Sequence, residues 1–257
     1  MTINYAAAET VEDFKHNLAV VEEKIAAACK AAGRARDEVR LLPVSKTVPE
    51  ERLFNAVAAG ATRLGENKVQ EAKRKWQNMR EATNDQLEWA VIGHLQRNKA
   101  KDVAEFAAEF QALDSVRLAE ALQRRLEMVE RELEVYVQVN TSAEESKFGL
   151  DPQDVDAFLD TLPNYPNLKV QGFMTLAIFS DDSDRVRTCF ELLRQIRDRA
   201  LLTHGDLIGS GLLSMGMSGD YELAIAEGAN CVRVGQAIFG SRKYPDSYYW
   251  PGAAGTN

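Results

Sequence analysis

The sequence predicts a single (β/α)8 barrel, a TIM barrel, preceded by an extra N-terminal helix. Strand-like and helix-like segments alternate eight times within about 200 residues, which is typical of parallel strands joined by helical crossovers. No Pro-, Gly- or Ser-rich linker interrupts them, and the 257 residues are close to the roughly 250 of a typical barrel. The alternative, an open doubly wound sheet, would normally carry a glycine-rich phosphate turn where this chain has Ser45-Lys46-Thr47. We expect residues 1–242 to form the barrel and residues 243–257 to form an extended or disordered tail.

A helix comes first in the chain. Thr10 followed by Asp13 is typical of an N-terminal cap with an acidic residue at the third helical position. Apolar residues then recur at spacings of three and four until Gly33 ends the helix, and they are Val11, Phe14, Leu18, Val21, Ile25 and Ala28. A coiled coil with a partner is the alternative. Because the stripe lasts less than three heptads, we expect it to pack against its own domain.

Four strand–helix units follow. The apolar run Val39–Lys46 predicts a buried strand, and Thr47 with Glu50 begins a helix that has Pro49 in its first turn and ends near Gly60. The next segments are, in order, the short strand Arg63–Glu66, the polar helix Asn67–Arg80, the strand Glu88–Gly93, the helix Asn98–Phe106, the weak strand Phe110–Asp114 and the long helix Ser115–Glu132.

The second half of the chain repeats this alternation. Glu134–Asn140 is the clearest strand, because Val135, Val137 and Val139 alternate along one face. The remaining segments are, in order, the helix Pro152–Leu162, the strand Leu168–Leu176, the helix Asp184–Leu202, the strand Leu212–Met217, the helix Asp220–Glu227 and the strand Cys231–Phe239.

The composition disfavours several classes of function. Lys and Arg number 31 and Asp and Glu 39, so the formal net charge of −8 makes nucleic acid and anionic membranes poor partners. The longest apolar run is too short to span a bilayer, and the first residues lack the order of a signal peptide. The cysteines (Cys29, Cys189 and Cys231) form no C-x-x-C pair, and no two histidines stand at metal-ligand spacing. We therefore expect a reduced, cytoplasmic, metal-free protein, and a monomer, because no apolar surface stripe is left unexplained.

Lys46 stands at the end of the first strand, where barrels of this type place their chemistry. Burial of its stem and a nearby cation would lower the pKa of the amine, and an uncharged amine can attack an aldehyde. The alternative is a lysine whose side chain extends from the strand end into solvent. The strand ends carry no pair of carboxylates suited to glycoside hydrolysis.

The seventh unit contains a candidate phosphate site. In Leu213–Asp220, the small residues Gly216 and Ser218 leave backbone N–H groups accessible, and a helix N-terminus favours a dianion. Barrels commonly bind phosphate after strands seven and eight, and Gly235 could complete the site. Barrel closure places strands one and eight side by side, so Lys46 would lie close to it. A phosphorylated aldehyde fits both ends, either pyridoxal 5′-phosphate or a sugar phosphate.

Eight ordered motifs resemble those of the pyridoxal phosphate homeostasis proteins (the YggS/PROSC type). They are L-P-V-S-K-T at 42–47, G-E-N-K-V-Q-E at 65–71, I-G-H-L-Q-R-N-K at 92–99, Q-V-N-T at 138–141, E-E-S-K-F-G-L at 144–150, G-F-M-T at 172–175, L-S-M-G-M-S at 213–218 and V-R-V-G-Q-A-I-F-G at 232–240. Two positions depart from the family's pattern: Phe148 stands where other members vary, and Lys68 replaces a frequent aromatic residue.

The resemblance implies the barrel fold of alanine racemase and bound pyridoxal phosphate. The residues that it assigns to the cofactor are Lys46 for an aldimine, Ser218, Gly235 and Gln236 for the phosphate, Arg233 for the pyridine nitrogen, and Asn67, Ser214 and Met215 for the ring.

Arg233 bears on whether the protein is an enzyme. If Val232 and Val234 face the helices, Arg233 points into the barrel. A guanidinium at the pyridine nitrogen disfavours protonation of that nitrogen, which weakens the ring as an electron sink. The alternative is a structural salt bridge, for instance to Glu66. A racemase also needs a second acid–base group opposite the lysine, which in alanine racemase comes from a separate C-terminal domain. After Gly240 this chain has only 17 residues left for one.

These observations favour a carrier of pyridoxal phosphate. We expect it to contribute to intracellular vitamin B6 and amino-acid homeostasis without efficient catalysis, with apo forms of pyridoxal-phosphate-dependent enzymes as partners. The alternatives are an amino-acid racemase of low activity, a Schiff-base aldolase acting on a sugar phosphate, and an acidic scaffold without a cofactor.

Overall fold

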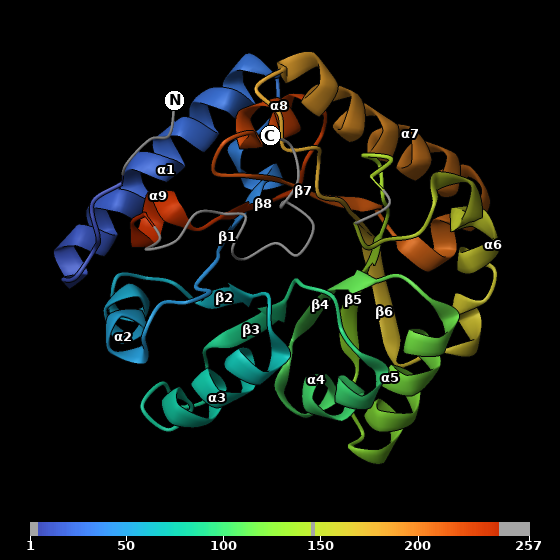
Figure 1. Cartoon of the computed structure of the whole chain (residues 1–257), viewed down its shortest axis with the longest axis horizontal. Helices are drawn as coiled ribbons and strands as arrows, with labels where there is room; N and C mark the ends of the chain where they lie inside the picture. The colour runs from blue at the N-terminus through green and yellow to red at the C-terminus, as the bar shows by residue number, and fades with distance from the viewer. Residues whose placement is uncertain (1–4, 145–146, 242–257) are drawn as a thin grey trace.

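Eight parallel strands form the centre of the molecule. The computed structural model describes residues 5–144 and 147–241. The strands are β1 (Arg40–Pro43), β2 (Arg63–Glu66), β3 (Glu88–Val91), β4 (Glu109–Leu113), β5 (Leu133–Gln138), β6 (Leu168–Met174), β7 (Leu212–Met217) and β8 (Cys231–Val234). Hydrogen-bonded neighbours follow the order β1-β8-β7-β6-β5-β4-β3-β2, and a parallel bridge from Val44 to Gly65 links β1 to β2. The sheet is therefore a nearly closed barrel (Figure 1), which confirms the predicted fold class and excludes the doubly wound sheet.

Helices surround the strands (Figure 1). They are α1 (Val11–Ala31), α2 (Glu50–Ala58), α3 (Val69–Met79), α4 (Ala100–Phe106), α5 (Val116–Met128), α6 (Val155–Leu159), α7 (Ser183–Ile208), α8 (Tyr221–Ala226) and α9 (Gln236–Phe239). Short 3-10 turns occur at Arg36–Glu38, Arg97–Lys99, Pro152–Asp154 and Leu162–Asn164.

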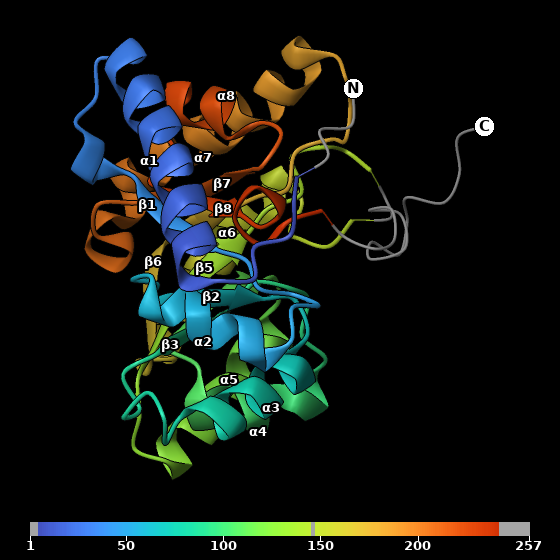
Figure 2. The same ribbon diagram turned by 90° about the vertical axis from the view of Figure 1, so that its left-hand side faces the viewer.

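The N-terminal helix α1 occupies the place of an eighth barrel helix. Thr10 and Asp13 form the predicted capping box, in which each side chain accepts a hydrogen bond from the other's backbone N–H. The helix packs against α8, α9 and α2 (Figure 2), and its residues Phe14 and Ile25 are fully buried. Because α9, which follows β8, has four residues, α1 covers the seam between the last and the first strand-helix units. The prediction that this stripe packs against its own domain is confirmed.

Alternate side chains of the strands enter two environments. Val232 and Val234 belong to the main hydrophobic core, which also contains the apolar faces of the helices. A second cluster joins Leu42, Ala90 and Cys231, from β1, β3 and β8, so these side chains meet inside the barrel. Other side chains inside the barrel are polar, among them Gln111, Ser214 and Arg233.

The eighth strand is shorter than predicted. The sequence predicts a strand over Cys231–Phe239, but β8 ends at Val234 and the residues after Gly235 form α9. Gly235, with φ −112° and ψ −71°, turns the chain out of the extended conformation. Phe239 is buried as a helical residue, and an apolar run alone does not distinguish a strand from a helix.

Four predicted helices also have wrong boundaries. Pro49, rather than Thr47, is the N-cap of α2. The predicted helix Pro152–Leu162 is divided between α6 and two flanking 3-10 turns. The helix α5 ends at Met128, before its predicted end, and α7 continues beyond its predicted end with a kink at His204.

The predicted tail, residues 243–257, lies outside the described residues. Among the helices of the described part, none is both long and apolar enough to cross a membrane.

Candidate functional site

The ends of β1, β7 and β8 assemble the predicted cofactor site. β1 lies beside β8, with Leu42 opposite Arg233, so Lys46 follows β1 next to the segment that follows β8. The backbone N–H of Gly235 donates to Ser218 Oγ over 3.4 Å, which joins the ends of β8 and β7. Residues distant in sequence therefore meet at the C-terminal face, as the closed barrel requires.

Lys46 is buried at this face. Its exposed fraction is 7%, so the hypothesis of a lysine that extends into solvent is wrong. Leu42 lies inside the barrel, and a Cβ on Gly65 would lie 3.5 Å from Val44 Cγ2 and 3.3 Å from Leu42 Cδ2. Because side chains alternate along an extended chain, Leu42 and Val44 face the same side, and Lys46 follows them in the turn closed by the hydrogen bond of 3.0 Å from the Val48 N–H to Ser45 O.

A buried ion cluster, formed by Glu66, Glu71 and Lys75, lies behind Lys46. Lys75 Nζ, on α3, contacts Glu66 Oε1 at 2.7 Å and Glu71 Oε1 at 2.8 Å. The cluster also contacts both sequence neighbours of Lys46. Ser45 Oγ donates to Glu66 Oε1 at 2.6 Å and Ser45 O accepts from Lys75 Nζ at 2.9 Å. The Thr47 N–H donates to Glu71 Oε1 at 2.9 Å.

Glu66 is the unusual member of this cluster. Burial raises its pKa to about 7, with Lys75 opposing the shift and Glu71 adding to it. Its Oε2 atom is buried without a hydrogen-bond partner in the described structure. A carboxyl in this environment can exchange a proton near neutral pH.

Arg233 points into the barrel, as the alternation with the valines predicts. It is 3% exposed, and its Nη1 and Nη2 donate to Ser214 Oγ and Thr175 O, each at 2.7 Å. Burial lowers the pKa of this guanidinium. The alternative of a salt bridge between Arg233 and Glu66 is wrong, because Glu66 pairs with Lys75.

A chain of hydrogen-bonded polar side chains inside the barrel, formed by Ser214, Gln111 and Glu109, leads away from this arginine. Ser214 Oγ donates to Gln111 Oε1 at 2.7 Å, and Gln111 Nε2 donates to Glu109 Oε1 at 2.6 Å. Glu109 Oε2 accepts from Arg40 and from Arg63, each at 2.7 Å. The chain therefore runs through the barrel from the first residues of β1 and β2 to the guanidinium. The sequence analysis did not identify Gln111 or Glu109.

The end of β7 and the turn after it, residues 216–220, contain the candidate phosphate site. Gly216 has φ 96°, and a Cβ on it would lie 2.7 Å from Ala224 Cβ, so glycine lets α8 approach the turn closely. The Met217 N–H donates to Asp220 Oδ1 at 2.6 Å, which fixes the turn around the half-buried Ser218. Burial raises the pKa of Asp220, a residue that the sequence analysis did not assign to the site.

The remaining predicted residues lie near this face. Asn67 is half-buried after β2, and a Cβ on Gly93 would lie 2.3 Å from Asn67 O, so only glycine fits there. Met215 is fully buried in the main core, and Gln236 is half-buried at the start of α9. Their contacts with a cofactor stay predictions.

An acid–base pair stands at the ends of β3 and β4. His94 Nδ1 lies 3.6 Å from Asp114 Oδ2, and burial raises the pKa of Asp114 while His94 opposes the shift. The His94 ring stacks on Phe148, with centroids 3.8 Å apart and planes 7° apart. Lys147 Nζ donates to Ala177 O at 2.9 Å, so Phe148 belongs to a loop anchored at this face.

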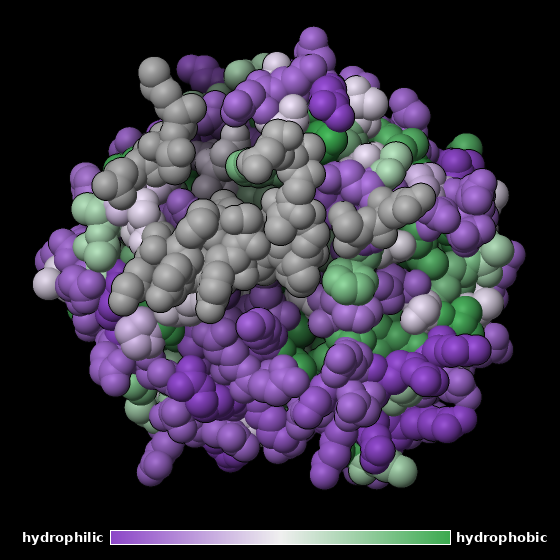
Figure 3. Space-filling view, viewed as in Figure 1, coloured by the Kyte–Doolittle hydropathy of each residue, from purple (hydrophilic) through white to green (hydrophobic). Residues whose placement is uncertain are grey.

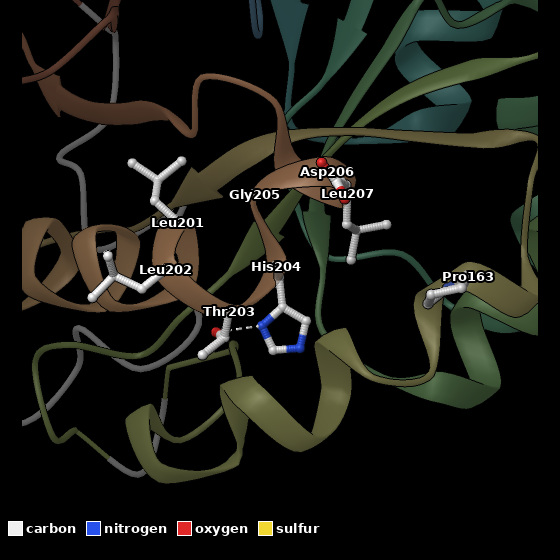
Figure 4. Close-up of a pocket in the computed structure, with 8 residues that line it drawn as sticks. All are labelled: Pro163, Leu201, Leu202, Thr203, His204, Gly205, Asp206 and Leu207. Carbon is white, nitrogen blue, oxygen red and sulfur yellow. Dashed lines mark hydrogen bonds between the residues drawn. The ribbon is translucent and has the colours of Figure 1, made fainter.

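The surface around this face is mostly hydrophilic, with hydrophobic residues gathered on the side where α6 lies (Figure 3). A pocket beside the kink of α7 is lined by Pro163 and residues 201–207 (Figure 4). There His204 contacts Thr203 Oγ1 at 2.8 Å and Asp160 Oδ1 at 3.0 Å. This pocket contains none of the predicted site residues. Within residues 5–144 and 147–241, no group of three or more His, Cys, Asp or Glu side chains could hold a metal ion.

Comparisons with known proteins agree with this geometry. Residues 11–243 match the family model described as alanine racemase, N-terminal domain. The chain is 39% identical over 236 residues to the pyridoxal phosphate homeostasis protein of Escherichia coli strain K12, covering 91% of this chain and 99% of the relative. It is 37% identical over 227 residues to the protein of that name from Aquifex aeolicus, covering 88% and 97%. The solved structure of PipY from Synechococcus elongatus PCC7942 with PLP bound is similar at a TM-score of 0.75 and 32% identity, covering 86% of this chain and 100% of that one.

Proposed function

The chain belongs to the family of the pyridoxal phosphate homeostasis proteins, whose barrel is that of the alanine racemase N-terminal domain, and we propose that it carries pyridoxal 5′-phosphate on Lys46. In this proposal the cofactor lies at the C-terminal face of the barrel, and the protein contributes to intracellular vitamin B6 and amino-acid homeostasis. The bound PLP of the PipY structure supports the identity of the cofactor.

The convergence of three groups carries the proposal. Lys46 is buried at the end of β1, Arg233 is buried on the adjacent β8, and the Ser218–Gly235 contact joins the turns after β7 and β8. An amine, a guanidinium and a phosphate-binding turn match the aldehyde, the ring nitrogen and the phosphate of one molecule. The uncharged amine would attack the aldehyde carbon, and the carbonyl oxygen would leave as water, which gives an aldimine.

The setting of Arg233 argues against efficient catalysis. A guanidinium held by Ser214 Oγ and Thr175 O faces the ring nitrogen in this proposal and keeps a proton off it. Pyridoxal phosphate supplies an electron sink that is strongest when this nitrogen is protonated. We therefore propose a carrier, with apo forms of pyridoxal-phosphate-dependent enzymes as recipients and the cytoplasm as its location.

The pair of His94 and Asp114 favours a second candidate, slow amino-acid racemisation. It supplies an acid–base group at the same face of the barrel as Lys46. Proton exchange at Cα needs such a group on the side opposite the lysine.

A spectrum of the purified protein tests the proposal. The wild type should be yellow with pyridoxal phosphate and lose this colour with borohydride, which should fix the cofactor on Lys46. Lys46→Ala should fold and stay colourless, whereas a yellow variant with cofactor fixed elsewhere would overturn the assignment. A wild-type protein that stays colourless but reacts with a sugar phosphate would support the aldolase instead.

Two further measurements separate a carrier from an enzyme. Incubation with single amino-acid enantiomers should leave their configuration unchanged, and racemisation that His94→Gln abolishes would support the second candidate. Arg233→Glu should let the ring nitrogen hold a proton, so this variant should gain slow transamination, visible as pyridoxamine phosphate. A variant that binds the cofactor normally without a change in spectrum or in this reaction would show that Arg233 does not face the nitrogen.

A further inference from the structure

The buried ion cluster behind Lys46 has no role in the function proposed so far. Glu66 and Lys75 have fully buried side chains, and the side chain of Glu71 is 21% exposed. Buried charges lose their hydration, and a buried ion pair is often no more stabilising than apolar residues of the same volume. The cluster therefore calls for an explanation other than stability alone.

Its contacts with the backbone indicate what it does. Lys75 binds the carbonyl of Ser45, and Glu71 binds the N–H of Thr47, so one helix, α3, holds the residue before Lys46 and the residue after it. Glu66 completes the arrangement from β2, because it accepts from both Ser45 Oγ and Lys75 Nζ.

The conformation of Thr47 shows that one of these contacts is made under strain. Its φ is 68°, in the left-handed region that a β-branched residue rarely adopts. Such a conformation is disfavoured and persists only where the surroundings enforce it. Two contacts hold this turn: the Val48 N–H donates to Ser45 O at 3.0 Å, and the exposed Thr47 donates its N–H in a charge-assisted hydrogen bond to Glu71. The second of these is the contact that comes from the cluster.

We infer that Glu66, Glu71 and Lys75 are positioning residues, which fix the backbone on both sides of Lys46 and so hold its amine at the barrel mouth. This inference rests on the proposed function, because the amine matters as the group that bonds to the cofactor. The turn that contains Lys46 and Thr47 ends the extended chain, and the cluster helps to keep that turn in place. An amine held in one place reacts faster, because less orientational freedom is lost on the way to the transition state.

Two substitutions at one position test this inference. Glu71→Ala removes the acceptor of the Thr47 N–H. Glu71→Gln keeps an accepting oxygen on a side chain of the same length. Lys73→Ala is the matched control, since Lys73 lies on the same helix and forms ion pairs of 2.8 and 2.7 Å with Asp102 and Glu105, away from Lys46.

The first measurement is hydrogen exchange of the Thr47 amide by NMR on the full chain without cofactor. Glu71→Ala should speed this exchange roughly ten- to a hundredfold, the effect of losing one hydrogen bond to a charged group. Glu71→Gln should restore most of the protection, and Lys73→Ala should leave it unchanged. Equal exchange in Glu71→Ala and the wild type would overturn the inference.

The second measurement is the rate at which pyridoxal phosphate forms the borohydride-reducible adduct, with the modified peptide identified. Glu71→Ala should slow the modification of Lys46 about tenfold, and Glu71→Gln should recover the wild-type rate. An unchanged rate in Glu71→Ala would contradict the positioning role even if the amide exchange changed. If the wild type is modified at another lysine, the proposed function fails, while the exchange data still decide whether the cluster fixes the backbone.

Discussion

Replacing Ser214 by Ala should separate support of Arg233 from contact with the cofactor ring. Ser214 Oγ accepts from Arg233 Nη1 and donates to Gln111 Oε1, each at 2.7 Å, and its side chain is fully buried. Alanine leaves a guanidinium N–H and an amide oxygen without partners inside the barrel. A buried hydrogen bond to a charged group contributes about 1.5–3 kcal/mol and a neutral one about 1 kcal/mol. We therefore expect the free energy of unfolding to fall by about 2–4 kcal/mol.

Urea unfolding followed by circular dichroism measures this change, and the melting temperature should fall by roughly 5–15 °C. Ser218→Ala is the control, because Ser218 is half-buried with one contact of 3.4 Å, so its stability should stay within about 0.5 kcal/mol of the wild type. In a titration with pyridoxal phosphate, Ser218→Ala should bind roughly ten- to a hundredfold more weakly. That variant should also discriminate less between pyridoxal phosphate and pyridoxal.

Two results would refute this reasoning. If Ser214→Ala unfolds at the same urea concentration as Ser218→Ala, the polar chain does not stabilise the barrel. If Ser214→Ala keeps its stability but shifts the absorbance of the bound cofactor, Ser214 contacts the ring directly, as the family resemblance implies.

Other parts of the structure give three further predictions. Burial raises the pKa of Glu66 to about 7 from its ordinary 4.5. Between pH 4.5 and 7 the folded state keeps a proton that the unfolded state releases, so the free energy of unfolding should fall as the pH rises, by roughly 3 kcal/mol in total. In urea unfolding, the stability of Glu66→Gln should depend less on pH than that of the wild type. Gly172→Ala should abolish soluble folded protein, because its Cβ would lie 2.0 Å from Leu212 O between β6 and β7, whereas Gly219→Ala, with nothing within 4 Å, should express normally. Asp220→Ala should weaken phosphate binding by about tenfold through loss of the contact that fixes the turn; equal affinity of Asp220→Ala and Asp220→Asn, which keeps the acceptor, would contradict this role.

Much of the fold could be predicted because its alternation is local. The bounds of β2 (Arg63–Glu66) and β7 (Leu212–Met217) agree with the predicted strands. The errors occur where local pattern is ambiguous: the apolar residues Ile238 and Phe239 fit a strand as well as the helix that they form. At Thr47, a hydroxyl before a helix suggested a cap, but this residue lies in a tight turn and donates its N–H to Glu71 from another unit.

The candidate site was predictable only in part for the same reason. Lys46 and Arg233 stand at strand ends, and Arg233 follows the alternation of its strand. Lys75 lies in the helix that the sequence analysis describes only as polar, yet its side chain is fully buried and pairs with residues from β2 and from the segment after β1. Gln111 acquires its role from Ser214, which lies 103 residues away in sequence. No spacing rule within one segment identifies such a contact.

The placement of α1 has a consequence for how the protein is made. The helix is synthesised before the strands, yet much of its packing is against α8 and α9, where the rings of Phe14 and Phe239 meet with centroids 5.5 Å apart. Both helices are among the last described residues to leave the ribosome. Tyr5 and Ser241, which exchange hydrogen bonds, are 236 residues apart. Contacts of such separation form slowly because a long loop must close. We therefore expect the closure of this seam to be a late step of folding, and the apolar stripe of α1 to stay uncovered until then.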